Sequence, residues 1–277
     1  MRRAGSVIGI LTALALGVAG TASAMPAPAP VGAQYVSLGD SYVATGSFAS
    51  GEMHGGCAQA SDSVGRLVAA RLPGVSFGDW ACGGADTADL TEDTPMGAQV
   101  AGLSANTRYV SLSIGGNNDD LFGDLVQNCL VALACTPEFQ QATDAKLDRL
   151  GPARDTAYDA VRAHAPHAKV VVVGYLRVLP DDAAGCFAEA LTTQPGVDFA
   201  NRVQRRLNDE IAAAVDRAGF TMVNRQQDDT HSMCAPDGAR HVSLTGIGPG
   251  DDGTPVHPTL LGRHYTADLV ADAFLGV

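Results

Sequence analysis

The stretch KVVVVGYL, residues 169–176, decides the fold class of this sequence. Its four valines, 170–173, present apolar side chains to both faces of an extended chain, which is typical of a strand covered on both sides. Such strands occur in parallel sheets, where crossover helices join one strand to the next. The stretch therefore predicts an α/β domain whose sheet is packed between helices.

Strand-like and helical patterns alternate on either side of this stretch. Short runs rich in β-branched residues predict further strands at 34–40, 75–82, 108–115 and 219–224. Helical patterns lie between them at 63–72, 138–165 and 198–218. The last of these has one apolar stripe, formed by Phe199, Val203, Leu207, Ile211 and Val215. The alternation predicts right-handed crossovers and a mostly parallel, five-stranded sheet.

The first 24 residues have the order of a secretory signal peptide: two arginines, an apolar stretch and the small residues Ala22-Ser23-Ala24. We therefore expect a secreted protein that is cleaved after Ala24. An N-terminal membrane anchor is the alternative, and the small-residue site disfavours it. Residues 25–33, MPAPAPVGA, are expected to form a flexible lead. No later stretch approaches the roughly 18 consecutive apolar residues that a bilayer span requires, so we expect no stable membrane span.

The remaining length and charge limit the domain number and the partners. Removal of 24 residues from 277 leaves 253, which suits one α/β domain of roughly 200–250 residues, here 34–277. The 30 acidic and 18 basic residues give the chain a net charge of −12, which becomes −14 without Arg2 and Arg3. Because such a chain repels polyanions, nucleic acid and anionic membranes are poor partner candidates. We expect a monomer.

Six cysteines in an exported chain predict three disulfides. Six cysteines allow 15 pairings. The sequential pairing has the fewest crossings and is the one we expect: Cys57–Cys82, Cys129–Cys135 and Cys186–Cys234. None of the cysteines forms a C-x-x-C motif, so we expect no metal site built from them.

The first strand leads into GDSY, residues 39–42, at the carboxyl edge of the predicted sheet, where ligands bind in such folds. Two interpretations are open: Asp40 and Ser41 cap a helix, or Ser41 is a nucleophile. A serine becomes a nucleophile only with a base that accepts its proton and donors that stabilise an oxyanion. Residues of both kinds follow other predicted strands.

Candidate donors follow the second and third strands. In SIGGNNDD, residues 113–120, two glycines allow a sharp turn that brings Asn117 to the same edge. In ACGGADT, residues 81–87, Gly84 can offer a main-chain N–H. Each motif alone is also what an ordinary turn contains.

A candidate base lies near the C-terminus. His257 precedes Pro258 and a predicted helix, with Leu261, Tyr265 and Leu269 on one stripe. Proline is favourable in a first helical turn, so the segment holds a histidine at a loop-to-helix junction. His264 is the competitor, but it should lie two turns into the helix and away from the sheet edge.

Together the four blocks resemble those of the SGNH (GDSL-type) hydrolases: GDSY with Ser41, Gly84, GGNN with Asn117, and HP with His257. The resemblance implies a three-layer α/β/α fold with flavodoxin-like strand order. It also implies a serine ester hydrolase in which Ser41 is the nucleophile and His257 the general base. The oxyanion hole would comprise the N–H groups of Ser41 and Gly84 and the side chain of Asn117. This chemistry requires no cofactor.

The cysteines and the loop THSMCAPDGARHV, residues 230–242, resemble the secreted, disulfide-containing bacterial lipases and esterases of that family. The resemblance implies that Cys186–Cys234 ties this loop down near the site. A small-molecule or lipid ester is the expected substrate, and a carbohydrate O-acetyl ester is the alternative. A different class of function, an exported binding protein that has lost catalysis, is suggested by two departures, Asn118 and Thr254.

These departures concern the family's acidic positions. Asn118 replaces the acid of the third block, and catalysis should survive because Asn117 is the donor. Thr254 stands where the family has the aspartate that orients the histidine. Asp251 and Asp252 are nearby alternatives with poor spacing. A main-chain carbonyl is preferred, since it can hold the imidazole Nδ1–H and select the tautomer.

Overall fold

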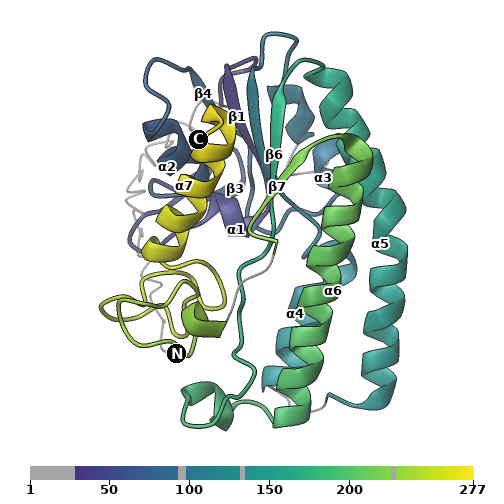
Figure 1. Ribbon diagram of the computed structural model, residues 1–277, viewed down its shortest axis with the longest axis vertical. Helices are drawn as coiled ribbons and strands as arrows, with labels where there is room; N and C mark the ends of the chain where they lie inside the picture. Colours follow the sequence, from purple (N-terminus) through teal and green to yellow (C-terminus); the bar gives the residue numbers. More distant parts are fainter. Residues whose placement is uncertain (1–28, 93–97, 132–134, 226–228) are drawn as a thin grey trace, which may run out of the picture.

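The computed structural model describes residues 29–92, 98–131, 135–225 and 229–277, so the predicted signal peptide lies outside the described residues. A parallel sheet of five strands forms the centre of the structure (Figure 1). Its strands, in spatial order, are β4 (Phe77–Asp79), β1 (Tyr35–Gly39), β5 (Tyr109–Ser113), β6 (Lys169–Val173) and β7 (Thr221–Val223). Counted along the chain, the order is 2-1-3-4-5, as in flavodoxin-like folds, and the predicted fold class is confirmed.

The valine run is the strand β6, and its side chains alternate between two cores. β6 pairs with β5 and β7, and the four valines are buried. Val170 and Val172 belong to one apolar core, and Val171 and Val173 belong to the other. A strand with apolar residues on both faces therefore packs against helices on both faces, as the sequence predicts.

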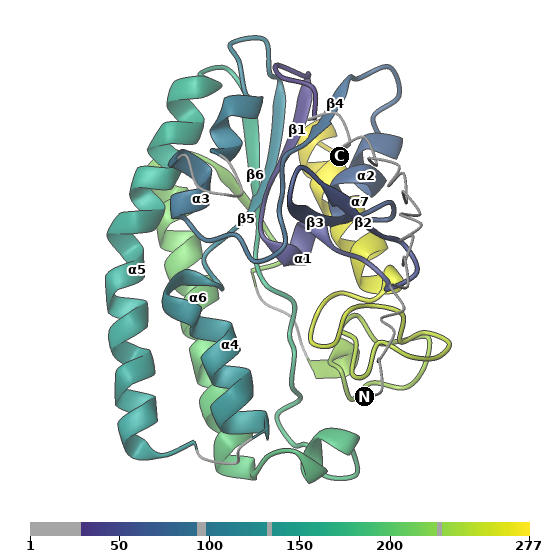
Figure 2. The same cartoon turned by 180° about the vertical axis from the view of Figure 1, so that it is seen from behind.

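Helices cover both faces of the sheet (Figures 1 and 2). On one face lie α2 (Val64–Ala70) and α7 (Leu260–Leu275). On the other lie α5 (Pro137–His164) and α6 (Gln194–Ala218). The helix α6 begins four residues before the predicted start because Thr193 caps it and Pro195 occupies its first turn.

The apolar stripe predicted for α7 is wrong. Leu261 is 42% exposed, whereas Arg263 is fully buried. The Arg263 guanidinium donates to Asp62 Oδ2 at 2.7 Å and to the Pro258 carbonyl at 2.7 Å. This pairing directs the Arg263 face of the helix inward, and the core side of α7 is formed by Ala267, Val270 and Phe274.

Several shorter elements were not predicted. An antiparallel hairpin joins β2 (Gly51–His54) to β3 (Cys57–Ala60). The short α-helices are α1 (Ser41–Ala44), α3 (Ala88–Thr91) and α4 (Leu121–Leu125), and α4 continues into a π-helix, η3 (Val126–Val131). The 3₁₀ turns are η1 (Gln99–Gly102), η2 (Asn118–Asp120), η4 (Phe187–Ala190) and η5 (Asp229–His231). Within the described ranges, none of the helices combines the length and apolarity that a bilayer crossing would require.

The end of the proline-rich lead differs from the flexible segment that we expected. Ala33 is 5% exposed, and the Gly32 N–H donates to the Gly102 carbonyl at 2.8 Å. The Pro30 carbonyl accepts a hydrogen bond from the Trp80 indole at 3.2 Å. These contacts fix the segment against the domain because its backbone groups find partners on the η1 turn and beyond β4.

The cysteines form the three sequential disulfides, Cys57–Cys82, Cys129–Cys135 and Cys186–Cys234. The first joins the hairpin to the turn after β4, and the third joins η4 to the loop before α7. Both lie beyond the carboxyl ends of the strands, where the sequence places its candidate functional residues.

Candidate active site

Ser41 is the first residue of α1, directly beyond the carboxyl end of β1. Asp40 is the N-cap, and its Oδ1 accepts a hydrogen bond from the Tyr42 N–H at 3.0 Å. The Ser41 hydroxyl is free of this capping role. The stretch GDSY thus contains a helix cap at Asp40 and an available hydroxyl at the next residue, so the two interpretations of the sequence apply to different side chains.

His257 lies against Ser41, and its Nε2 is 2.7 Å from Ser41 Oγ. Its Nδ1 is 2.9 Å from the Pro255 carbonyl oxygen. A carbonyl accepts but cannot donate, so this contact requires a proton on Nδ1 and leaves the Nε2 lone pair of the neutral ring for the Ser41 hydroxyl. Burial lowers the pKa of His257 below its usual 6.5, although the Pro255 contact opposes the shift.

The chain between Pro255 and His257 makes a strained turn. Val256 has a φ of 67°, which is an outlier for a β-branched residue. The turn is held by the Tyr42 hydroxyl, which donates to the Val256 carbonyl at 2.8 Å, and by the Val256 N–H, which donates to the Ser243 carbonyl at 2.9 Å. This backbone conformation directs the Pro255 carbonyl back towards the imidazole.

The two aspartates considered as orienting acids bind elsewhere. Asp251 accepts hydrogen bonds from Leu244 N and from the backbone and hydroxyl of Thr245. Asp252 Oδ1 accepts from Leu260 N at 2.9 Å, at the start of α7. Neither carboxylate contacts His257, so the structure contradicts the aspartate alternative, and the preferred main-chain carbonyl is that of Pro255.

The candidate oxyanion donors lie on neighbouring turns. Asn117 Nδ2 donates one of its hydrogens to the Ala85 carbonyl at 2.8 Å, which leaves a second N–H available. Gly84 immediately precedes this acceptor and has a φ of +86°, a conformation that favours glycine. Among the described residues, no acceptor contacts the main-chain N–H of Ser41 or of Gly84. Ser41, Asn117 and His257 line one cavity, whereas Gly84 lies outside its lining.

Asn118, which stands where the family has an acid, joins the turn after β5 to the turn that contains Gly84. Its Oδ1 accepts from the Thr87 N–H at 3.2 Å, and its Nδ2 donates to the Thr87 hydroxyl at 2.6 Å. The Asn118 amide supplies the acceptor for the Thr87 N–H and the donor for the Thr87 hydroxyl, so both groups of Thr87 are paired. The departure at this position therefore fits its local partners.

The cavity beside Ser41 has a volume of about 420 Å³. Its lining comes from the α4–η3 segment, from the chain after β6 and from α6. Its apolar lining includes Phe122, Leu125, Val126, Leu130, Val178 and Leu179. An apolar cavity next to a serine–histidine pair can accept the hydrocarbon portion of an acyl group.

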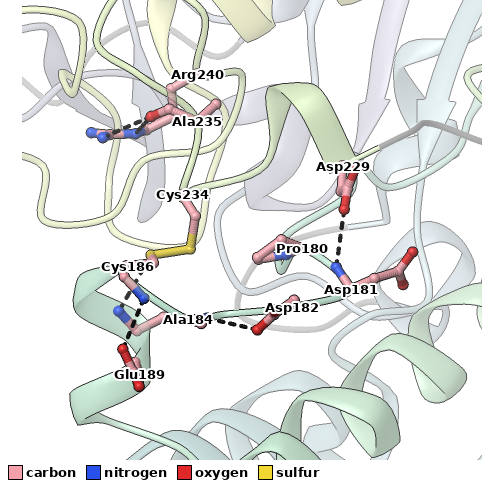
Figure 3. Close-up of a disulfide and its surroundings, with 12 residues drawn as sticks. Pro180, Asp181, Asp182, Ala184, Cys186, Glu189, Asp229, Cys234, Ala235 and Arg240 are labelled. Atoms are coloured by element: carbon pink, nitrogen blue, oxygen red, sulfur yellow. Dashed lines mark hydrogen bonds between the residues drawn. A yellow bond between two sulfur atoms is a disulfide. The ribbon is translucent and has the colours of Figure 1, made fainter.

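The loop 230–242 lies next to the His257 segment. Ser243 N donates to the His257 carbonyl at 2.8 Å, and Thr259 N donates to the His241 carbonyl at 2.9 Å. Figure 3 shows the disulfide Cys186–Cys234, which joins this loop to the segment around η4. In the same view, the Asp181 N–H donates to Asp229. These bonds restrain the loop that adjoins the histidine.

The competing histidine is remote from the cavity. His264 lies exposed on α7, and its Nδ1 is 3.1 Å from the Arg71 guanidinium. Among the described residues, no group of three or more His, Cys, Asp or Glu side chains is arranged to hold a metal ion.

Two buried residues at the site were not identified from the sequence as a pair. Asp40 is 1% exposed and Tyr175 is 1% exposed, and the Tyr175 hydroxyl donates to Asp40 Oδ2. Burial raises the pKa of Asp40 to about 7, although the hydrogen bonds from Tyr175 and Tyr42 oppose this shift. The strand predicted at 169–176 includes Tyr175, whereas β6 ends at Val173, so the sequence pattern did not place Tyr175 beyond a strand end.

Known proteins similar to this chain were found by sequence and by structure. Residues 37–264 match the GDSL-like Lipase/Acylhydrolase family. Lipase 2 of Streptomyces coelicolor is 31% identical over 274 residues, which cover 94% of this chain and 92% of that protein. The structure of phospholipase A1 from Streptomyces albidoflavus NA297 superposes with a TM-score of 0.70 and 27% identity over 89% of this chain and 99% of that one. The extracellular lipase from Streptomyces rimosus gives a TM-score of 0.66 and 27% identity over 86% and 98%, respectively.

Proposed function

The chain belongs to the GDSL-like lipase/acylhydrolase family and is a carboxylic ester hydrolase. We propose that it cleaves acyl esters through an acyl-enzyme on Ser41. The observation that carries the proposal is the 2.7 Å contact between His257 Nε2 and Ser41 Oγ. That distance lies within the hydrogen-bond reach required of a nucleophile and its general base.

In the first step, His257 Nε2 accepts the Ser41 hydroxyl proton while Ser41 Oγ attacks the ester carbonyl carbon. The carbonyl oxygen becomes an oxyanion, which is stabilised by the N–H groups of Ser41 and Gly84 and by the second Nδ2 hydrogen of Asn117. The imidazolium then donates its proton to the alcohol oxygen, and the alcohol leaves. Ser41 retains the acyl group as an ester.

In the second step, water attacks the acyl-enzyme while His257 accepts its proton, and the acid is released as Ser41 regains its hydrogen. The Pro255 carbonyl holds Nδ1–H throughout and so keeps the ring in the tautomer that this chemistry needs. It stabilises the imidazolium less than a carboxylate would. The turn that presents this carbonyl is held by the hydrogen bonds from the Tyr42 hydroxyl to the Val256 carbonyl and from the Val256 N–H to the Ser243 carbonyl.

The cavity supports a fatty acyl substrate over an O-acetyl ester. A cavity of roughly 150 Å³ holds benzene, so about 420 Å³ has room for a chain of about ten or more carbons. An acetyl group would leave most of its apolar lining without contacts. A lipid or medium-chain ester is therefore favoured as the substrate class.

We also propose export, with cleavage after Ala24. Three disulfides support an oxidising compartment, and the similar lipase of Streptomyces rimosus is described as extracellular. N-terminal sequencing of the protein from culture medium tests this directly. A mature chain that still begins before Ala24 would contradict the proposed cleavage site.

Hydrolysis of p-nitrophenyl esters from acetate to palmitate tests the function. We expect turnover by the oxidised protein with an optimum longer than acetate. Ser41→Ala should abolish turnover, and Asn117→Ala should lower kcat by roughly 10²–10³ because one oxyanion donor is lost. Absence of turnover in correctly folded protein would favour the exported binding protein, and an acetate optimum would favour the O-acetyl esterase.

A further inference from the structure

One hydroxyl group joins two of the turns that carry candidate oxyanion donors, the turn at Asp40–Ser41 and the turn at Gly116–Asn117. The Tyr175 hydroxyl donates to Asp40 Oδ2 and accepts a hydrogen bond from the Gly116 N–H at 2.8 Å. Asp40 immediately precedes Ser41, and Gly116 immediately precedes Asn117. We propose that Tyr175 is a positioning residue that sets the relative placement of the Ser41 N–H and the Asn117 amide. This inference rests on the proposed ester hydrolysis.

The sheet itself does not connect these turns. Strands β1 and β5 are paired up to Gly39 and Ser113, and the Asp40 N–H donates to the Ser113 carbonyl at 2.9 Å. Beyond that bond, within the part of the chain that the structure describes, no direct hydrogen bond joins residues 41–45 to residues 114–118. The Tyr175 hydroxyl, which comes from the next strand, bridges the turns where the ladder ends.

Tyr175 is fixed firmly enough to act as a reference point. Asn208 on α6 accepts from its N–H at 2.9 Å and donates to its carbonyl at 2.9 Å. Its ring makes edge contacts with Tyr42, at a centroid distance of 4.9 Å, and with Phe122, at 5.0 Å. Because both the backbone and the ring of Tyr175 are held, its hydroxyl has a fixed position and can hold the groups that it binds in place.

The bridge requires a group that accepts and donates at once. The Gly116 N–H can only donate and an Asp40 carboxylate can only accept, so a hydroxyl between them satisfies both. Phenylalanine would preserve the ring contacts but leave both partners unpaired in a buried place. The two turns would therefore be free to move apart.

The chain also offers a matched control. Tyr158 on α5 is 1% exposed, packs against Phe220 at a centroid distance of 5.6 Å, and lies outside the cavity lining. Among the described residues, no group hydrogen-bonds to its hydroxyl. Tyr158→Phe therefore removes a buried tyrosine hydroxyl without touching either turn.

The test is a double-mutant cycle on a p-nitrophenyl ester of intermediate chain length, with wild type, Tyr175→Phe, Asn117→Ala and the double variant. We expect Tyr175→Phe to lower kcat by roughly 10- to 100-fold, a part of the loss expected for a deleted oxyanion donor, with little change in KM. Once the Asn117 amide is removed, its placement relative to the Ser41 N–H no longer affects the rate, so the double variant should be no slower than Asn117→Ala alone. Tyr158→Phe should keep the wild-type kcat.

Three outcomes would overturn the inference: an unchanged kcat in Tyr175→Phe, a rise in KM alone, or losses that multiply in the double variant. Wild type and Ser41→Ala are measured first, so a failure of the proposed hydrolysis appears as their equal inactivity and is distinguished from a failure at Tyr175. If Tyr175→Phe does not fold, Asn208→Ala loosens Tyr175 from outside the cavity. Asn208→Ala should lower kcat in the wild-type protein but cause no further loss when it is added to Asn117→Ala. Losses that multiply would again contradict the positioning role.

Discussion

Replacement of Asp251 by asparagine should lower stability and spare turnover. Asp251 is 4% exposed, and its carboxylate accepts from Leu244 N at 2.7 Å, Thr245 N at 2.8 Å and Thr245 Oγ1 at 2.7 Å. Burial alone would raise the pKa of Asp251, but the hydrogen bonds from Thr245 and its neighbours hold it below the usual range. The carboxylate therefore organises the loop before His257 and has no contact with the imidazole.

The size of the effect follows from the two Thr245 donors. Asparagine keeps one acceptor oxygen and carries an NH₂ group in place of the other. The Thr245 N–H then loses its acceptor, whereas the Thr245 hydroxyl can turn and accept from the new amide. One unsatisfied buried donor costs about 1–3 kcal/mol, so for a chain of this length the unfolding temperature should fall by about 2–12 °C. A residue that orients the histidine would instead lower kcat by roughly 10⁴ when its charge is removed.

The assay compares thermal unfolding by circular dichroism with kcat measured at mildly alkaline pH, well below the unfolding transition. Asp252→Asn is the matched variant, because Asp252 binds Leu260 N at 2.9 Å and also lacks contact with His257. We expect both variants to turn over at a rate close to wild type, with the larger loss of stability in Asp251→Asn. A fall in kcat of roughly 10³ or more in a well-folded variant would refute the role assigned to the Pro255 carbonyl.

Three further predictions concern the base, a disulfide and the cavity. Burial lowers the pKa of His257, and only the neutral ring accepts the Ser41 proton, so kcat/KM should decline with falling pH around a midpoint below 6.5. A midpoint above 6.5 would contradict the assignment of His257 as the general base. Replacing Cys186 and Cys234 together by serine opens a loop with a sequence separation of 48, and denaturant unfolding should show a loss of about 4 kcal/mol; an unchanged midpoint would show that the loop is held without the bond. Val178→Phe narrows the cavity, so the preferred p-nitrophenyl ester should become shorter, and an unaltered chain-length profile would remove this cavity from acyl binding.

The parts of the fold that the sequence predicted correctly depend on local pattern. The valines 170–173 can be buried on both faces only in a covered, parallel strand, and the apolar period of α6 selects one face of a helix. The sequence pattern does not predict the hairpin of β2 and β3, because its strands, GEMH and CAQA, contain no β-branched residue. The stripe on α7 was wrong because an ion pair between Arg263 and Asp62, 201 positions apart, decides which side faces inward.

In the candidate site, too, some features follow from local sequence pattern and others depend on contacts between distant residues. Ser41, Asn117 and His257 could be proposed because each follows a predicted strand or precedes a helix at one edge of the sheet, and their catalytic roles remain predictions. The turn at Val256 could not be foreseen, since a β-branched residue rarely adopts a positive φ and only the surrounding hydrogen bonds hold it there. Nor could the bridge through Tyr175, which exists only because three strand ends converge.

The proposed hydrolysis requires an activated serine at position 41, and mass-spectrometric mapping of a fluorophosphonate adduct tests for it. The oxidised wild-type protein should react stoichiometrically, with the label on the peptide that contains Ser41 and with parallel loss of ester hydrolysis. His257→Ala should lose most of this labelling, because the 2.7 Å partner that accepts the hydroxyl proton is gone. A label on another serine, or no label on a protein that still hydrolyses esters, would contradict the Ser41 acyl-enzyme.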